Sequence, residues 1–348
     1  MVGGQHSGIS KEPVSLFIVS TPLQLISCSE ARRYFSPKHS LLIVARPSNA
    51  STEQHMRNML AALGWQDSEV IFLGRRLSYL SLAWRLHRLR RLLLNGLYIG
   101  NKGSWVHEVF VRSLPTDQVV YLDDGMATIT DYYNLCEGKS ESPINRRQLR
   151  WLGYLGIRLT DVLPKPHYFT IFPLSACPEV AITYNDLSLF KCAFPPRSGG
   201  SLSDVVAFVG QPLTNDPEYL KSVRRQLTIL QTRHANYRIV YYMHRKENRQ
   251  TLTKAFAGCN VDIILPDMPL EVEMARAEHR PVALYSLIST ALFTLKAIIP
   301  EVSVFYIPDE NLARRVRYYK EIIEIMEKIG VQRAELSDAL ATQEEIKV

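Results

Sequence analysis

The sequence predicts a protein of two doubly wound α/β domains. Short apolar runs alternate with amphipathic stretches along its 348 residues, and this order starts again in the second half. Such alternation is typical of βαβ units around parallel sheets. A chain of this length also exceeds what one hydrophobic core usually organises, which favours two domains of roughly 150 to 200 residues each.

The first half contains four apolar runs that we interpret as strands, at 15–20, 40–45, 69–74 and 118–122. Amphipathic stretches between these runs predict helices over 22–34, 51–63 and 77–94. The middle helix starts at a Ser-Thr pair and stops at Gly64, and these residue types favour helix ends. The region therefore has the element order of one α/β domain.

A linker is expected near the middle of the chain. The region 137–201 is less regular and is richer in Pro, Gly and Ser than the flanking regions. Its segment 193–200 cannot readily continue a helix or a strand. We therefore predict an N-terminal Rossmann-like domain over 1–195 and a C-terminal Rossmann-like domain over 196–348.

The second half repeats the alternation, with strands expected at 204–209, 237–243, 261–265, 281–285 and 303–307. Its first helix is predicted to begin at Asn215-Asp216-Pro217, because an acceptor side chain before a proline satisfies the free amides of a first turn. The last helix is expected over 310–329 and is followed by Gly330.

Polar residues follow the predicted strands in both halves. Ligands of doubly wound sheets bind at the carboxyl ends of the strands, so we expect the functional site in a central cleft between the two domains. The polar groups at these positions are Thr21, Gln24, the Asp123-Asp124-Gly125 turn, Gln211, the His244-Arg245 pair, Glu271 and the segment 286–290.

The composition is that of an ordinary globular protein, with 46% hydrophobic and 22% charged residues. The net charge of +7 favours anionic partners such as nucleotides, acidic glycans, nucleic acid or a negatively charged membrane surface. The cysteines are odd in number and lack the spacing of a zinc site. We interpret all five as reduced core thiols, namely Cys28, Cys136, Cys177, Cys192 and Cys259.

A cytoplasmic location is expected. Residues 1–13 lack the basic start and the apolar run of a signal peptide. The apolar region 281–299 is interrupted by polar residues and is followed by Pro300, so a buried strand and helix are favoured over a membrane span.

The Asp123-Asp124-Gly125 turn is the strongest candidate for acid–base chemistry. Its alternative interpretation is an ordinary strand-closing turn, because Asp and Gly are common turn residues. Two adjacent carboxylates repel each other, which can raise the pKa of one of them toward the range of a general base. The chain has no Asp-x-Asp metal signature, so a metal-independent mechanism is expected.

Three groups in the second half suit a ligand that carries phosphate and ribose groups. His244 can be a structural histidine, but Arg245 and Lys246 beside it favour contact with a phosphate. Ser289 and Thr290 open a helix, where they act as a cap and can also bind an anion. Glu271 in a first helical turn is expected from the helix dipole alone, and it could also hold ribose hydroxyls.

The segment 75–91, from Arg75 to Arg91, interleaves arginines with apolar residues. Most such segments are solvated helix faces. The alternative is a basic amphipathic helix that contacts anionic lipid headgroups or an acidic glycan acceptor, and the sequence leaves both interpretations open.

These motifs together resemble the bacterial sialyltransferases of the α-2,8-polysialyltransferase-like and lipooligosaccharide sialyltransferase group. That family has a GT-B fold and carries acidic-acidic-Gly, His-Pro and Ser-Ser/Thr motifs. Asp123-Asp124-Gly125, His244-Arg245 and Ser289-Thr290 are similar to these motifs, although Arg245 stands where many members have proline. The segments around Thr21-Pro22-Leu23-Gln24 and Gly210-Gln211 are also similar to that family.

The resemblance implies an inverting, metal-independent enzyme that moves sialic acid from a CMP-sugar to a bacterial surface glycan without a cofactor. It implies that Asp124 is the general base and that His244 contacts or protonates the donor phosphate. Ser289 and Thr290 would bind that phosphate, and Glu271 would hold the cytidine ribose. The protein would work in the cytoplasm, either free or as a peripheral protein on the inner membrane.

Two other functions are compatible with the sequence. One is a GT-B transferase that uses a UDP- or GDP-sugar, whose two phosphates would call for additional positive groups. The other is a basic protein that binds a polyanion, suggested by the net charge and the arginine-rich segment. This second function leaves the placement of the acids unexplained, so no nucleic-acid partner is expected.

Overall fold

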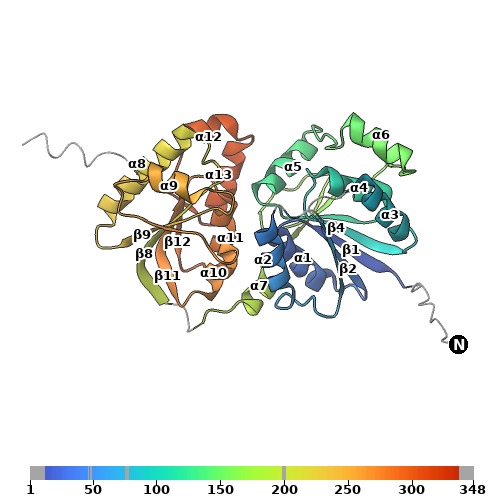
Figure 1. Cartoon of the computed structure of the whole chain (residues 1–348), viewed down its shortest axis with the longest axis horizontal. Helices are drawn as coiled ribbons and strands as arrows, with labels where there is room; N and C mark the ends of the chain where they lie inside the picture. Colours follow the sequence, from blue (N-terminus) through green and yellow to red (C-terminus); the bar gives the residue numbers. More distant parts are fainter. Residues whose placement is uncertain (1–11, 46, 48, 75–77, 198–200, 337–348) are drawn as a thin grey trace, which may run out of the picture. The chain divides into compact units, whose positions relative to one another are not determined.

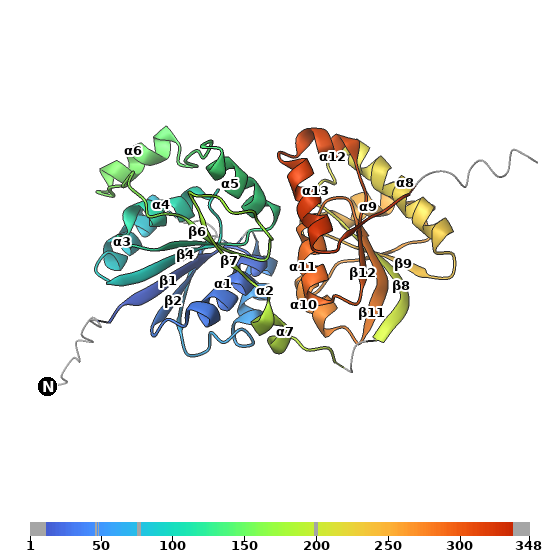
Figure 2. The same cartoon turned by 180° about the vertical axis from the view of Figure 1, so that it is seen from behind.

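The computed structural model describes residues 12–45, 47, 49–74, 78–197 and 201–336. The chain forms two compact units, Met1–Ala193 and Phe194–Val348, and each is built on one parallel sheet with helices packed against it (Figures 1 and 2). The predicted class of two Rossmann-like α/β domains is confirmed. The cleft between them stays a prediction, and part of the predicted linker, 198–200, lies outside the described residues.

The first unit contains a seven-stranded sheet in which all neighbouring strands are parallel. The chain adds its second and third strands on one side of the first strand, and then adds the fourth on the other side of the first. Doubly wound sheets bind ligands at this point, where the strand order changes direction. The sheet order is β3 (Glu69–Leu73), β2 (Ser40–Ala45), β1 (Val14–Val19), β4 (Leu94–Ile99), β5 (Val119–Leu122), β6 (His167–Thr170) and β7 (Ala181–Tyr184).

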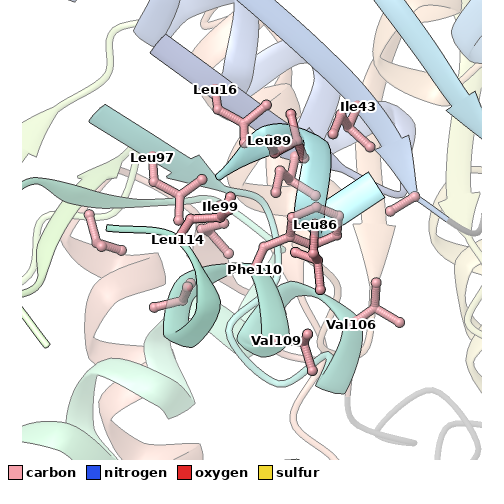
Figure 3. Close-up of a cluster of buried hydrophobic side chains, with 14 of the residues drawn as sticks. Leu16, Ile43, Leu86, Leu89, Leu97, Ile99, Val106, Val109, Phe110 and Leu114 are labelled. Atoms are coloured by element: carbon pink, nitrogen blue, oxygen red, sulfur yellow. The ribbon is translucent and has the colours of Figure 1, made fainter. Parts of the chain in front are cut away.

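The helices of the first unit are α1 (Pro22–Phe35), α2 (Ala50–Leu60), α3 (Tyr79–Leu89), α4 (Trp105–Ser113), α5 (Met126–Cys136), α6 (Arg146–Tyr154) and α7 (Ser188–Ala193). Figure 3 shows how α3 and α4 cover one face of the sheet, with Leu86 and Phe110 packed near Leu16. On the other face, the ring of Phe17 stacks on Tyr98 at 4.3 Å. Each of these fully buried apolar side chains contributes roughly 1.5 to 3 kcal/mol to folding.

The helix expected over 77–94 is too long, and the expected strands omit β4. In the structure α3 ends at Leu89, the backbone N–H of Arg90 donates to Leu86 O, and β4 starts at Leu94. The leucines at 92–94 continue a helix-like apolar pattern, but pairing with β1 and β5 in the sheet centre overrides it. The four-residue strands β6 and β7 lie in the region that we expected to be irregular.

The second unit contains a six-stranded parallel sheet, in the order β10 (Asp262–Ile264), β9 (Arg238–Tyr242), β8 (Ser201–Val209), β11 (His279–Ser286), β12 (Ser303–Tyr306) and β13 (Gln332–Arg333). Its helices are α8 (Pro217–Arg233), α9 (Arg249–Ala255), α10 (Leu270–Arg276), α11 (Thr290–Ile298), α12 (Glu310–Arg315) and α13 (Tyr319–Lys328).

Local signals explain where several of these helices begin and end. As predicted, Asp216 caps α8, and its carboxylate accepts from the backbone N–H of Glu218 at 3.0 Å. The single last helix expected over 310–329 is wrong, because Tyr318 adopts a left-handed conformation (φ 59°) that separates α12 from α13. In the described part of the chain, no helix is long and apolar enough to cross a membrane.

The cysteines do not form a set of reduced core thiols. Cys136 at the end of α5 forms a disulfide with Cys177, their Cα atoms 6.2 Å apart. Of the other three, Cys28 is buried, Cys259 is half-buried and Cys192 is exposed. Because 41 residues separate the two cysteines in the sequence, no local pattern indicated that they form a disulfide. It is the sheet, through β6 and β7, that brings the second cysteine back to α5.

Candidate functional site

In the first unit, the predicted acid turn lies among the ends of three adjacent strands, β1, β4 and β5. Asp124 is half-buried, and its Oδ1 accepts from Gln24 Nε2 at 2.5 Å. The backbone N–H of Asp124 donates to Thr128 Oγ1 at 2.8 Å. The backbone and the carboxylate of Asp124 are therefore both held by neighbouring elements.

Gln24 is fully buried and has protein partners at both ends of its amide. Its Oε1 accepts from the backbone N–H of Ser20 at 2.7 Å, which turns Nε2 toward Asp124. Thr21 caps α1 by accepting from the backbone N–H of Gln24 at 3.3 Å. The role in donor binding expected for Thr21 and Gln24 stays a prediction. In the structure they organise the start of α1 and the Asp124 carboxylate.

A buried histidine that the sequence did not single out extends this network. His107 on α4 is fully buried, and its Nδ1 accepts from the backbone N–H of Asn101 at 3.1 Å. Its other nitrogen, Nε2, therefore carries the proton and donates to Ser20 Oγ at 2.9 Å. The Ser20 hydroxyl in turn donates to Ala45 O. Burial lowers the pKa of His107 to about 3, so this ring is neutral at pH 7.

Asp123 and Asp124 have different environments. Asp123 is buried, and its carboxylate accepts from Thr170 Oγ1 at 2.5 Å and from the backbone N–H of Ile171 at 2.8 Å. Burial, with a smaller contribution from Asp124, raises the pKa of Asp123 to about 7. Asp123 therefore joins β5 to the end of β6, while Asp124 is the more accessible carboxylate.

Gly125 makes this turn possible. Its φ of 68° lies in the left-handed region, where a side chain would be strained, and it stands at the N-cap position of α5. The chain can thus pass directly from β5 through the two aspartates into a helix.

In the second unit, a polar network follows β8 and β9. The backbone N–H of Gln211 donates to the hydroxyl of Tyr219 at 3.0 Å, which lies 3.4 Å from the hydroxyl of Tyr241. Tyr241 donates to Glu247 Oε1 at 2.8 Å. Burial raises the pKa of Glu247 to about 7. A Cβ at Gly210 would lie 2.3 Å from Glu247 Oε2, so a larger residue where β8 ends would have to displace that side chain.

His244 is held on this network through its backbone. Its N–H donates to Glu247 Oε2 at 2.7 Å, and its Nδ1 accepts from the backbone N–H of Lys246 at 3.2 Å. Burial, together with the charges of Arg245 and Lys246, lowers the pKa of His244 to about 4. The ring is therefore neutral at pH 7, and its protonated Nε2 is a hydrogen-bond donor.

The other residues predicted to bind the donor occupy the ends of neighbouring elements. Ser289 caps α11 by accepting from the backbone N–H of Ala291 at 3.3 Å, and Thr290 is the first residue of that helix. Gln211 is buried, and its Nε2 has no hydrogen-bond partner in the described part of the protein. Glu271 on α10 accepts from Thr294 Oγ1 of α11 at 3.1 Å. Its predicted contact with a ribose stays a prediction.

The second sheet brings several predicted residues to one edge. Because β9, β8 and β11 are adjacent and parallel, the groups that follow them leave the sheet on the same side. These groups are His244 and Arg245 after β9, Gln211 after β8, and Ser289 and Thr290 after β11. In the described residues, no three His, Cys, Asp or Glu side chains are grouped so that they could hold a metal ion. Metal independence stays a prediction.

Comparisons with known proteins show the fold. No family model and no curated protein matches the chain. Among solved structures, it is similar to UDP-GlcNAc 2-epimerase from Neisseria meningitidis bound to UDP-GlcNAc, with 12% identity, a TM-score of 0.51, and 96% and 98% of the two chains covered. The corresponding epimerase from Methanocaldococcus jannaschii gives 10% identity, a TM-score of 0.51 and coverage of 96% and 92%.

A structure of S. aureus MnaA with UDP matches at 10% identity with a TM-score of 0.52, over 85% of this chain and 79% of that one. The chain has a GT-B-type fold. The resemblance to bacterial sialyltransferases is wrong, because no sialyltransferase family model matches and the similar structures are UDP-GlcNAc 2-epimerases. The motifs that suggested it are short, and function has to be argued from the site as a whole.

Proposed function

We propose that this protein is a GT-B enzyme that acts on a UDP-sugar, with transfer of the sugar to a hydroxyl acceptor as its reaction. The observation that carries the proposal is the edge of the second sheet, where hydrogen-bond donors follow three adjacent parallel strands. Similarity in fold to structures that contain UDP or UDP-GlcNAc supports the choice of nucleotide.

The second unit supplies groups that suit a diphosphate. Phosphate oxygens only accept hydrogen bonds, and the neutral His244 offers a donor at Nε2. The buried amide of Gln211 and the N-terminus of α11 add further donors. Arg245 and Lys246 place two positive charges beside the histidine, as two phosphate groups require.

The first unit supplies the candidate base. Asp124 is the more accessible carboxylate of the acid turn, and Gln24 fixes its orientation from the buried side. A carboxylate held in this way can accept the proton of an acceptor hydroxyl as the new glycosidic bond forms. We assign Asp124 as the general base and Asp123 as the group that anchors the turn.

The binding half of the proposal is tested by thermal unfolding with UDP, GDP and CMP. UDP is expected to raise the unfolding temperature most, and His244→Ala is expected to reduce that shift. His279→Ala is a matched control, since this exposed histidine lies at the start of β11. Equal responses to all three nucleotides, or none to UDP, would refute the choice of donor.

A 2-epimerase is the second candidate, favoured by similarity to the Neisseria meningitidis enzyme over 96% of this chain. Epimerisation at C2 breaks a carbon–hydrogen bond, whereas sugar transfer leaves that bond intact. Incubation with UDP-GlcNAc in D2O without an acceptor therefore separates the two. Deuterium at C2 would identify an epimerase, and UDP release that depends on an acceptor would identify a transferase. Asp124→Asn should abolish transfer, while Asp117→Asn at an exposed position should not.

A further inference from the structure

Helices α3 and α6 form a surface of uncovered apolar side chains on the first unit. The two helices lie side by side in both views (Figures 1 and 2). The exposed fractions are 69% for Leu80 and 54% for Trp84 on α3, and 46% for Trp151 and 80% for Tyr154 on α6. We call these two helices the α3–α6 surface. Large apolar patches of this kind mark interaction sites on soluble domains.

The aromatic side chains of the α3–α6 surface are held in place. Trp151 stacks on Tyr79 with ring centroids 6.2 Å apart, and Tyr154 packs edge-on against Trp151. Arg90, which follows α3, donates through its guanidinium to the carbonyl oxygens of Ser113 at the end of α4 and of Arg158 in the segment after α6. The exposed rings therefore belong to an ordered surface, and Arg90 has a structural role.

The charged residues of these two helices have one sign. Neither α3 nor α6 contains an Asp or Glu. Arg88 is exposed, and its guanidinium lies 4.9 Å from the ring centroid of Trp84. Further exposed arginines on α6 are Arg146, Arg147 and Arg150. Of the basic segment noted in the sequence, 75–77 lies outside the described residues.

We propose that the α3–α6 surface docks on an anionic phospholipid bilayer. Tryptophan and tyrosine rings favour the headgroup level of a bilayer, and the arginines can contact lipid phosphates. A soluble polyanion would be attracted by the arginines alone and would leave four large apolar side chains in water. A bilayer takes up both kinds of group, which is the behaviour of interfacial amphipathic helices.

Sedimentation with lipid vesicles tests the proposal. The protein is expected to bind vesicles of phosphatidylcholine with one third phosphatidylglycerol at low salt, and to bind pure phosphatidylcholine vesicles at least tenfold more weakly. High salt should weaken the binding, because screening removes the attraction to the phosphates. Failure to bind the anionic vesicles, together with binding to heparin, would overturn the proposal in favour of a soluble polyanion.

Two pairs of variants separate the apolar and the charged contributions. Trp84→Ser with Tyr154→Ser, and Arg88→Gln with Arg150→Gln, should each weaken binding roughly tenfold or more. Leu202→Ser with Leu265→Ser is the apolar control, because both leucines are 50% exposed in the second unit. Lys254→Gln with Lys328→Gln removes two exposed charges elsewhere. Equal binding by the test and control pairs, with unfolding temperatures unchanged, would overturn the proposal.

Discussion

Gln24 Nε2 lies 2.5 Å from Asp124 Oδ1, although the two residues are 100 positions apart in the sequence. The glutamine has no exposed surface, and its oxygen is already engaged by the backbone N–H of Ser20. Its amide nitrogen is therefore directed at the carboxylate before any ligand arrives. We therefore infer that Gln24 orients the carboxylate of Asp124.

Gln24→Ala is expected to lower turnover of the UDP-sugar on the order of 100-fold, because a displaced base loses alignment with the proton that it accepts. It should also lower the free energy of unfolding by roughly 1 to 3 kcal/mol, since the N–H of Ser20 loses its partner. Steady-state kinetics and denaturant unfolding measure the two effects. Gln54→Ala, at an exposed position on α2, is the control. Unchanged turnover in Gln24→Ala would refute the orienting role.

Gly100→Ala is expected to disturb the same network from the end of β4. A Cβ at this position would lie 2.6 Å from Gln24 Oε1 and 2.9 Å from its Cβ, and the buried glutamine has no room to move. We expect a loss of about 1 to 3 kcal/mol in the free energy of unfolding, as for other overpacked sites. Gly153→Ala is the control, because a Cβ there meets nothing within 4 Å. Equal stability of the two variants would contradict the predicted clash.

The sequence predicted the two-domain fold and most of its strands, because buried parallel strands appear as short apolar runs. It also placed Asp123 and Asp124 after a strand. It could not show which carboxylate is buried, since the partners that decide this, Thr170 and Gln24, are 47 and 100 positions away from the acids they bind. Local sequence carries no trace of such contacts.

His107 and Glu247 were missed as members of the site for different reasons. His107 lies on α4, which follows β4, the strand that the expected elements omit. The apolar run that ends at Gly100 was the signal that could have revealed that strand. Glu247 lies directly after His244, Arg245 and Lys246 in the turn that follows β9. Its role depends on Tyr241 of β9 and on the backbone of His244 in the turn that follows, and only the folded structure shows these two contacts.

The Cys136–Cys177 disulfide is expected to stabilise the first unit. Thiol titration of the unfolded, unreduced protein should find three of the five cysteines free. Replacing both bonded residues by serine should lower the free energy of unfolding by about 3 to 4 kcal/mol, because the bond closes a long loop in the unfolded chain. Cys192→Ser, at an exposed free thiol, is the control. Five titratable thiols would show that the bond does not form.

Glu247 is expected to make stability depend on pH between about 4.5 and 7. The pKa of this carboxyl is 4.5 without its surroundings and about 7 in the folded protein, chiefly because of burial. Below pH 4.5 the carboxyl is protonated in both the folded and the unfolded protein, so it does not make the free energy of unfolding depend on pH. As pH rises toward 7, only the unfolded chain releases the proton, so the free energy of unfolding falls, and above 7 the loss is complete.

Glu247→Gln should remove this dependence, because glutamine stays neutral at every pH. The difference in free energy of unfolding between the variant and the wild type should therefore shift by on the order of 1 to 3 kcal/mol in favour of the variant as pH rises from 4.5 to 7. Asp123 titrates in the same range, but it is present in both proteins and its contribution cancels. Urea unfolding at a series of pH values measures the difference, with Glu324→Gln on α13 as an exposed control. If the free energy of unfolding changed with pH in the same way for Glu247→Gln and the wild type, the carboxyl would already be ionised in the folded state. The hydrogen bonds from Tyr241 and His244, which lower its pKa, would then outweigh the effect of burial, which raises it.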